Sequence, residues 1–158
     1  MIAVGMQSLQ LSPNDQTLSF LPWAHSFGQL AEVHLLIQSG YSTGLVADVD
    51  EIVSDMSLVK PTVFFAVPRV YNRIFDRLHG QISEKPQLIQ NLFRAGLKHA
   101  KREREGETLS FTENLSLTLA RKIIFKKILD RFGGRLRLAV SGASALSAEV
   151  AEFVNDIG

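Results

Sequence analysis

The residues best suited to chemistry lie in two short loops. The first, residues 22–28, reads Pro-Trp-Ala-His-Ser-Phe-Gly and places one histidine beside two aromatic side chains. An imidazole can donate a hydrogen bond near neutral pH, so His25 could orient a carboxylate or a phosphate. The alternative is that His25 only caps or packs against a helix, as single ionisable residues often do.

The second loop, residues 141–147, reads Ser-Gly-Ala-Ser-Ala-Leu-Ser. Such small residues between a strand and a helix allow a flat ring or a phosphate to approach the backbone amides. The alternative is simple tight packing of a strand against its helix. The loop is not G-x-G-x-x-G and has no P-loop lysine, so its spacing alone does not assign a nucleotide.

Strand and helix patterns alternate along the chain and determine where these loops lie. This alternation predicts an α/β fold, a layered and mostly parallel sheet with flanking helices. In residues 26–39, Leu30, Val33, Leu36 and Ile37 recur at helical spacing. We expect strands at 17–21, 42–47, 62–67 and 135–141, and helices at 26–39, 48–59, 68–78, 86–105, 111–132 and from 147 onward.

Local residues mark several of the expected boundaries. The segment 62–67 is apolar without alternation, which is typical of a strand buried on both faces. Pro68 can be the first residue of the helix that follows. Ser110 and Glu113 have the spacing of a capping box, and Gly40 stands where a helix-ending glycine is expected.

The predicted sheet places the candidate loops at one edge. In open α/β sheets, ligands bind beyond the carboxyl ends of the strands. Residues 22–28, 68–69 and 141–147 each follow an expected strand. If the strands are parallel, all three loops open on the same side.

Composition excludes several classes of protein. The 17 Lys and Arg against 16 Asp and Glu leave a net charge of +1, which excludes a strongly basic nucleic-acid binder. The absence of cysteine excludes disulfides, Cys-ligated zinc, iron–sulfur clusters and thiol catalysis. The longest apolar run, Val63–Val67, is far shorter than the ~20 residues of a membrane span. Met1–Met6 has no signal-peptide pattern, so we expect a cytoplasmic protein.

Two other kinds of site are not supported. No His, Asp and Glu residues have metal-ligand spacing, since Glu32 and His34 would point in different directions on a helix. Ser141 and Gly142 resemble part of a nucleophile elbow, but a hydrolase needs its histidine after the serine. No histidine follows Ser141, so the hydrolase interpretation fails.

Charged residues give weaker predictions. Arg69, at a helix start, could bind an anion, although a structural salt bridge is the preferred interpretation. A basic run could meet a membrane surface or the phosphates of CoA; its residues are Lys98, Lys101, Arg102, Arg104, Lys122, Lys126, Lys127 and Arg131. Because Glu103, Glu105 and Glu107 dilute it, we favour a solvated helix face.

Three segments resemble a known family. Leu21–Gly28 resembles the L-P-x-x-H-x-x-G segment of adenylate-forming acyl-CoA synthetases, the AMP-binding (ANL) superfamily. Lys60–Tyr71 resembles a stretch common among long-chain fatty acid CoA ligases, and Arg135–Leu146 is similar to their R-L-R-x-x-x-S-G-[GA]-A-P-L segment. Their order and spacing match over about residues 10–158. The resemblance is to an internal part of the large N-terminal domain of these ligases.

The resemblance implies an activity and assigns residues to it. A ligase of this family uses ATP and Mg²⁺ to convert a fatty acid to an acyl-adenylate and then transfers the acyl group to CoA. His25 matches the residue near the reacting carboxylate, where it would orient the acid and stabilise charge. Gly142, Ala143 and Ser144 match the loop that packs against adenine, and Trp23 could line the acyl tunnel.

The sequence also departs from the family. Ala143 replaces a common glycine, and Ala145 replaces the usual proline. The T-S-G-T-T-G-x-P-K-G phosphate loop would lie before Met1, and the Y-G-x-T-E segment would follow Gly158. The later T-G-D motif and the C-terminal domain with its catalytic lysine are likewise not in the sequence.

These departures set the remaining expectations. We expect residues 1–158 to form a single partial domain, truncated at both ends and inactive alone. The partners would be fatty acid, ATP and CoA in the parent enzyme, with no nucleic acid and with peripheral membrane contact left open. Exposed strand edges favour self-association of the piece. The alternative is a non-catalytic α/β module for binding or assembly.

Overall fold

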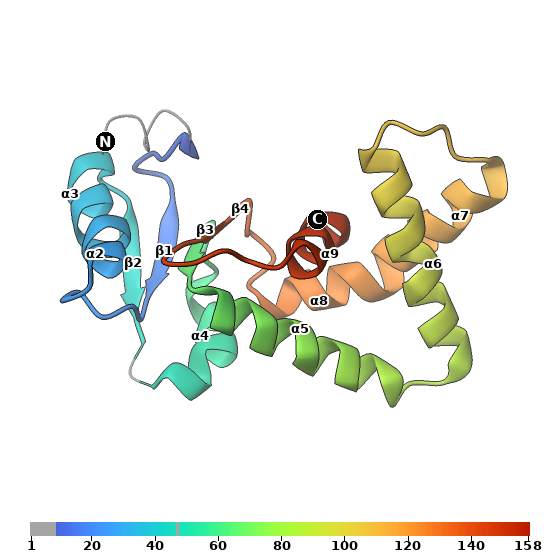
Figure 1. Ribbon diagram of the computed structural model, residues 1–158, viewed down its shortest axis with the longest axis horizontal. Coiled ribbons are helices and arrows are strands. Elements are labelled where there is room, and N and C mark those ends of the chain that lie inside the picture. The colour runs from blue at the N-terminus through green and yellow to red at the C-terminus, as the bar shows by residue number, and fades with distance from the viewer. Residues whose placement is uncertain (1–8, 47) are drawn as a thin grey trace. The chain divides into compact units, whose positions relative to one another are not determined.

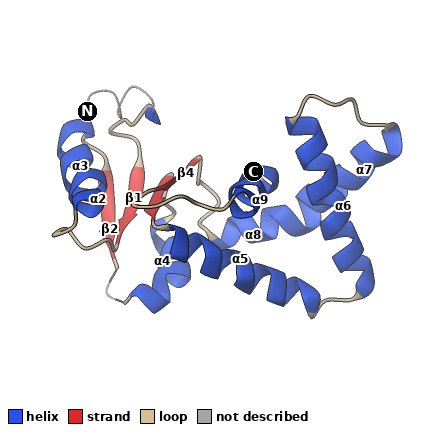
Figure 2. Ribbon diagram, in the orientation of Figure 1, coloured by secondary structure: helices blue, strands red, loops and turns tan. Residues whose placement is uncertain are grey.

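The computed structural model describes residues 9–46 and 48–158. The chain divides into two compact units (Figure 1). We call Met1–Val67 with Asp130–Ala145 the sheet unit, and Pro68–Leu129 with Leu146–Gly158 the helical unit. Every strand among the described residues lies in the sheet unit (Figure 2).

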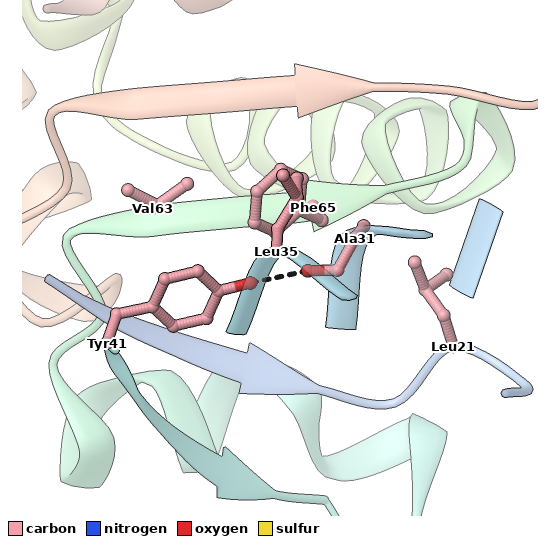
Figure 3. Packing of buried hydrophobic residues seen from close by; sticks show 6 residues of the cluster. All are labelled: Leu21, Ala31, Leu35, Tyr41, Val63 and Phe65. Atoms are coloured by element: carbon pink, nitrogen blue, oxygen red, sulfur yellow. Dashed lines mark hydrogen bonds between the residues drawn. The ribbon is translucent and has the colours of Figure 1, made fainter. Parts of the chain in front are cut away.

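Four short parallel strands occur in the described part of the sheet unit. β1 (Gln16–Ser19) pairs with β2 (Ser42–Leu45), and β3 (Val63–Ala66) pairs with β4 (Leu138–Ser141). The arrows of all four point the same way in Figure 3. The two pairs are joined where β1 and β3 begin, because the Thr62 N–H donates to the Gln16 carbonyl at 2.8 Å. The predicted α/β fold with parallel strands is confirmed, although each strand is shorter than expected and Ala47 lies outside the described residues.

A helical segment, residues 26–39, follows β1. It consists of α2 (Ser26–Gly28), a π-helical stretch over Gln29–His34, and α3 (Leu35–Ser39). Gly40, with φ of 70°, ends it as predicted. The buried face carries Ala31, Glu32 and Leu35, while Leu30 and Ile37 of the predicted apolar pattern are exposed. The spacing predicted the helix correctly but not its buried face.

The core of the sheet unit lies between the strands and this helical segment (Figure 3). The Tyr41 hydroxyl donates to the Ala31 carbonyl, which ties the start of β2 to the helix. Every residue of β3 is at most 1% exposed, so the prediction of a strand buried on both faces is confirmed. A further helix, α4 (Ile52–Val59), follows a 3₁₀ turn over Val49–Glu51.

A buried carboxylate fixes the amino ends of the strands. Asp15, 5% exposed, accepts hydrogen bonds from Arg137 Nε at 2.9 Å and Nη2 at 2.7 Å. It also accepts one from the Thr62 hydroxyl at 2.7 Å. The Arg137 hydrogen bond holds the pKa of Asp15 well below its usual range. One aspartate therefore holds together the segments that lead into β1, β3 and β4.

The helical unit begins at α5 (Pro68–Ser83), whose first residue is the predicted proline. It continues through α6 (Gln87–Arg104) and α7 (Phe111–Ala120). A π-helical stretch over Arg121–Phe125 joins α7 to α8 (Lys126–Arg131), so residues 111–131 form one helical segment, close to the prediction. α9 (Ala148–Ile157) completes the unit. The capping box of Ser110 and Glu113 is confirmed.

Aromatic rings form the core of the helical unit. The Phe75 and Phe153 rings meet edge to face with centroids 5.0 Å apart. Phe93 makes a similar contact with Phe125 at 6.1 Å. His79 lies among these rings, and its Nδ1 is 3.0 Å from the Phe75 carbonyl oxygen. α5, α6 and α9 therefore share one apolar centre with the π-helical stretch.

Three basic residues of α6 form ion pairs. Lys101 donates to Glu152 at 2.7 Å and Arg104 donates to Asp156 at 2.8 Å, both across to α9. Arg102 pairs with Glu107 and with Glu113. The side chains of Lys101, Arg102 and Arg104 remain 28–42% exposed, so the helix face is solvated as predicted, and its charges are in addition paired with acidic residues.

Two further findings concern expectations from the sequence. Arg69 is exposed, and no ion pair involving it occurs in residues 9–46 and 48–158, so the predicted structural salt bridge is wrong. Within those same ranges, no helix is both long and apolar enough to cross a membrane.

Candidate functional site at the carboxyl edge of the sheet

Two of the three candidate loops meet in the sheet unit. A Cβ atom built on Gly142 would overlap the ring of Phe27, so this ring lies directly against the loop after β4. The Gly142 N–H donates to the Ala66 carbonyl at 3.1 Å, which places the same loop beside the end of β3. The first and last candidate loops are therefore neighbours at the carboxyl edge, as the parallel sheet predicted. The third loop, Pro68-Arg69, begins the helical unit.

The geometry of residues 21–28 explains why this segment has its sequence. Leu21 is buried in the core, and the Pro22 carbonyl accepts from the His25 N–H at 3.0 Å, which closes a tight turn. Gly28 packs so closely on this turn that a Cβ atom there would overlap the Pro22 carbonyl oxygen. The leucine anchors the loop, and only glycine permits the return of the chain.

His25 stands at the start of α2 with its side chain exposed. Its backbone is extended, with φ of −92° and ψ of 143°, and its carbonyl accepts from the Gln29 N–H at 2.8 Å. The imidazole makes no capping hydrogen bond. The alternative of a side-chain cap or a packed histidine is therefore wrong, and the ring is accessible to a ligand.

The side chain of Trp23, two positions before His25, is held by hydrogen bonds at its indole N–H. Its indole N–H donates to Glu32 at 3.0 Å and lies 3.2 Å from the Ser19 hydroxyl. The residue is nevertheless 52% exposed. An apolar ring held in place by its polar edge is suited to contact an apolar ligand.

Glu32 is a residue of this site that the sequence analysis did not single out. It is 2% exposed and accepts from the N–H groups of Phe20 at 3.0 Å and Leu21 at 2.9 Å, and from the Ser19 hydroxyl. No local pattern in the sequence marked Glu32, because the π-helical stretch over Gln29–His34 changes which residues of the segment face inward.

The loop after β4 forms an open turn of small residues. Ala143 has φ of 69°, the left-handed region, and both Ala143 and Ser144 are exposed. The Ser141 hydroxyl is enclosed and has no hydrogen-bond partner among the residues that the structure describes.

The described residues offer no cluster of metal ligands. Residues 9–46 and 48–158 contain no group of three or more His, Asp and Glu side chains placed to hold an ion.

Comparison with known proteins decides the family. The model of the family described as "AMP-binding enzyme" matches residues 1–158. The chain belongs to the AMP-binding enzyme family. The resemblance noted from three segments of the sequence is thereby confirmed over the whole AMP-binding chain.

The relatives of this AMP-binding chain include long-chain acyl-CoA synthetases. It is 35% identical over 147 residues to long chain acyl-CoA synthetase 3 of Arabidopsis thaliana, covering 92% of this chain and 21% of the relative. It is 36% identical over 143 residues to human long-chain-fatty-acid–CoA ligase 1, covering 90% and 19%. The chain thus spans about a fifth of the length of these relatives.

A solved structure shares the fold of this AMP-binding chain. It is the A domain of carboxylic acid reductase from Segniliparus rugosus, in complex with AMP and a co-purified carboxylic acid. The TM-score is 0.54 with 24% identity, over 90% of this chain and 19% of that chain. The likeness supports the arrangement of strands and helices described above.

Proposed function

We propose that this chain is a segment of the large N-terminal domain of a long-chain fatty acid–CoA ligase. The ligase would join a fatty acid to the adenylyl group of ATP, releasing pyrophosphate, and then transfer the acyl group from the acyl-adenylate to the thiol of CoA, releasing AMP. The observation that carries the proposal is the meeting of the two motif loops, through Phe27 and Gly142, in a chain of the AMP-binding family. A site for an acid beside a nucleotide requires these loops to be neighbours.

His25 is the residue that we assign to the reacting carboxylate. Its imidazole is exposed at the carboxyl edge, and its backbone is fixed by hydrogen bonds on both sides. An N–H of the ring would donate to the carboxylate, orient it and stabilise charge during attack on the α-phosphorus of ATP. No covalent bond to His25 is needed.

The turn of Gly142, Ala143 and Ser144 is assigned to the nucleotide. Its exposed small residues would let adenine lie flat against the backbone. ATP supplies the adenylyl group, and Mg²⁺ would offset the charge of its phosphates. We assign neither Mg²⁺ nor CoA to particular residues of this chain.

Trp23 is assigned to the acyl chain of the fatty acid. Its half-exposed ring lies in the same loop as His25, so the carboxylate and the first part of the chain would contact adjacent residues. Burial of an alkyl chain against an indole is favourable in proportion to the apolar area covered.

The first experiment is to sequence the reading frame on both sides of the segment. A phosphate-loop motif before it and Y-G-x-T-E after it would support the ligase. A reading frame with neither motif would overturn the proposal and favour the alternative, a non-catalytic binding or assembly module. Ala143 and Ala145, which stand at family glycine and proline positions, are the residues that give this alternative its weight.

The second experiment tests the chain by itself. We expect the purified 158-residue chain to form no AMP from ATP, Mg²⁺ and palmitate, because no P-loop-like phosphate segment is in its sequence. Fatty-acid-dependent AMP formation, measured by chromatography of the nucleotides, would contradict this expectation.

A further inference from the structure

Glu32 is a buried carboxylate satisfied entirely by neutral donors. The Phe20 and Leu21 N–H groups donate to Oε1, while the Trp23 indole and the Ser19 hydroxyl donate to Oε2. Among the described residues, no lysine or arginine pairs with it. A buried charge of this kind is tolerated only where its hydrogen bonds are nearly complete.

All of these donors come from one stretch of chain, residues 19–23, where β1 ends and the motif loop begins. One oxygen therefore fixes the backbone that leads into Pro22, and the other fixes the ring of Trp23. Because Pro22 also closes the turn to His25, the position of the imidazole depends on the same carboxylate.

We propose that Glu32 is the positioning residue of this site. From inside the sheet unit, Glu32 holds the Trp23 ring and the loop that carries His25. The acyl chain would then contact Trp23, and its carboxylate would contact His25, in positions fixed before the ligand binds. The proposal rests on the function proposed above only for the identity of the ligand. Its structural part, the control of Trp23 by Glu32, stands on the hydrogen bonds alone.

Trp23 gives a direct measurement, because it is the only tryptophan in the chain. In Glu32→Gln, one carboxylate oxygen is replaced by an NH₂ group, which cannot accept the indole or hydroxyl hydrogen. We expect a shifted emission maximum and faster quenching of Trp23 by acrylamide, with an unchanged far-UV circular dichroism spectrum. The matched control is Glu51→Gln, an exposed glutamate of the same unit, which should leave the emission unchanged.

Ser19→Ala provides a milder change in case Glu32→Gln does not fold. It removes one donor to Glu32 and a second acceptor of the Trp23 indole N–H but keeps the Glu32 carboxylate, so the Trp23 emission should shift in the same direction by less. If a folded Glu32→Gln, or Ser19→Ala in its place, has the emission and quenching of the wild type, the proposal is wrong.

The longer protein that carries this segment tests the link to the ligand. We expect Glu32→Gln to raise the KM for palmitate and to lower kcat/KM by about tenfold or more, with little change in the KM for ATP. A purely structural residue would instead lower the amount of active enzyme and leave both KM values unchanged, which would overturn the positioning role. If the wild-type protein shows no fatty-acid-dependent pyrophosphate release, the proposed function fails, while the fluorescence result still decides whether Glu32 positions Trp23.

Discussion

At the scale of single residues, the site shows strain where the sequence departs from its family. Ala143 adopts φ of 69° although its side chain disfavours the left-handed region. A glycine at this position would remove the clash of the methyl group with the backbone. The conformational strain of Ala143 therefore lies in the loop that we assign to the nucleotide.

Ala143→Gly should stabilise the sheet unit by about 1 kcal/mol, since relief of the left-handed strain exceeds the entropy cost of a glycine. Urea unfolding followed by Trp23 fluorescence measures this unit. The control is Ala145→Gly, at a position without positive φ, which should be neutral or destabilising. A lower midpoint for Ala143→Gly would show that the methyl group contributes packing that outweighs the strain.

Asp15 gives the fold a dependence on acid pH. Its pKa is depressed in the folded state, chiefly by the Arg137 hydrogen bond, so it stabilises the fold above the pKa of the unfolded state, near 4. This contribution should decline as the pH falls below about 4, because the unfolded chain then binds a proton that the folded chain does not.

Asp15→Asn should therefore cost about 2 kcal/mol at pH 7, and the difference from the wild type should shrink as the pH falls below about 4. Urea unfolding at a series of pH values gives both numbers. A difference that is the same at pH 7 and at pH 3 would mean that the charge of Asp15 contributes nothing to stability.

At the scale of elements, close packing of helices depends on a glycine. A Cβ atom on Gly96 of α6 would overlap the Ala120 methyl group of α7 and touch the Phe125 ring. Gly80 of α5, by contrast, has nothing within 4 Å of its Cβ position. The two glycines thus provide a matched pair in helices of the same unit.

Gly96→Ala should destabilise the helical unit by about 1–3 kcal/mol through overpacking. Gly80→Ala should stabilise it by roughly 0.5–1 kcal/mol through helix propensity. Thermal unfolding followed by circular dichroism at 222 nm compares them. Equal effects of the two substitutions would show that α6 and α7 do not pack as described.

Local sequence patterns predicted these elements well. The strands, the capping box at Ser110 and the proline at the start of α5 follow from neighbouring residues, so each could be found without tertiary information. The buried face of residues 26–39 could not, because a π-helical stretch changes the phase of the helix. The ion pairs of α6 with α9 also could not, since their partners are about fifty residues apart.

At the scale of the whole molecule, the family could be recognised because its motifs are short and local. The residues that hold those motifs in place were missed for the same reason. Asp15 and Arg137 are separated by 122 positions in the sequence. Glu32 reaches its hydrogen-bond donors only because the helical segment folds back against the end of β1. Self-association and membrane contact stay predictions, as do the roles of His25, Trp23 and the turn after β4.

Pyrophosphate release by the longer protein that carries this segment tests the central claim most directly. We predict release that depends on palmitate and ATP, and a loss of about a hundredfold in kcat for His25→Ala with little change in the KM for ATP. The control is His34→Ala, which changes an exposed histidine of the helical segment that follows His25. This variant should behave as the wild type. Absence of palmitate-dependent release by the wild type, or full activity of His25→Ala, would contradict the account.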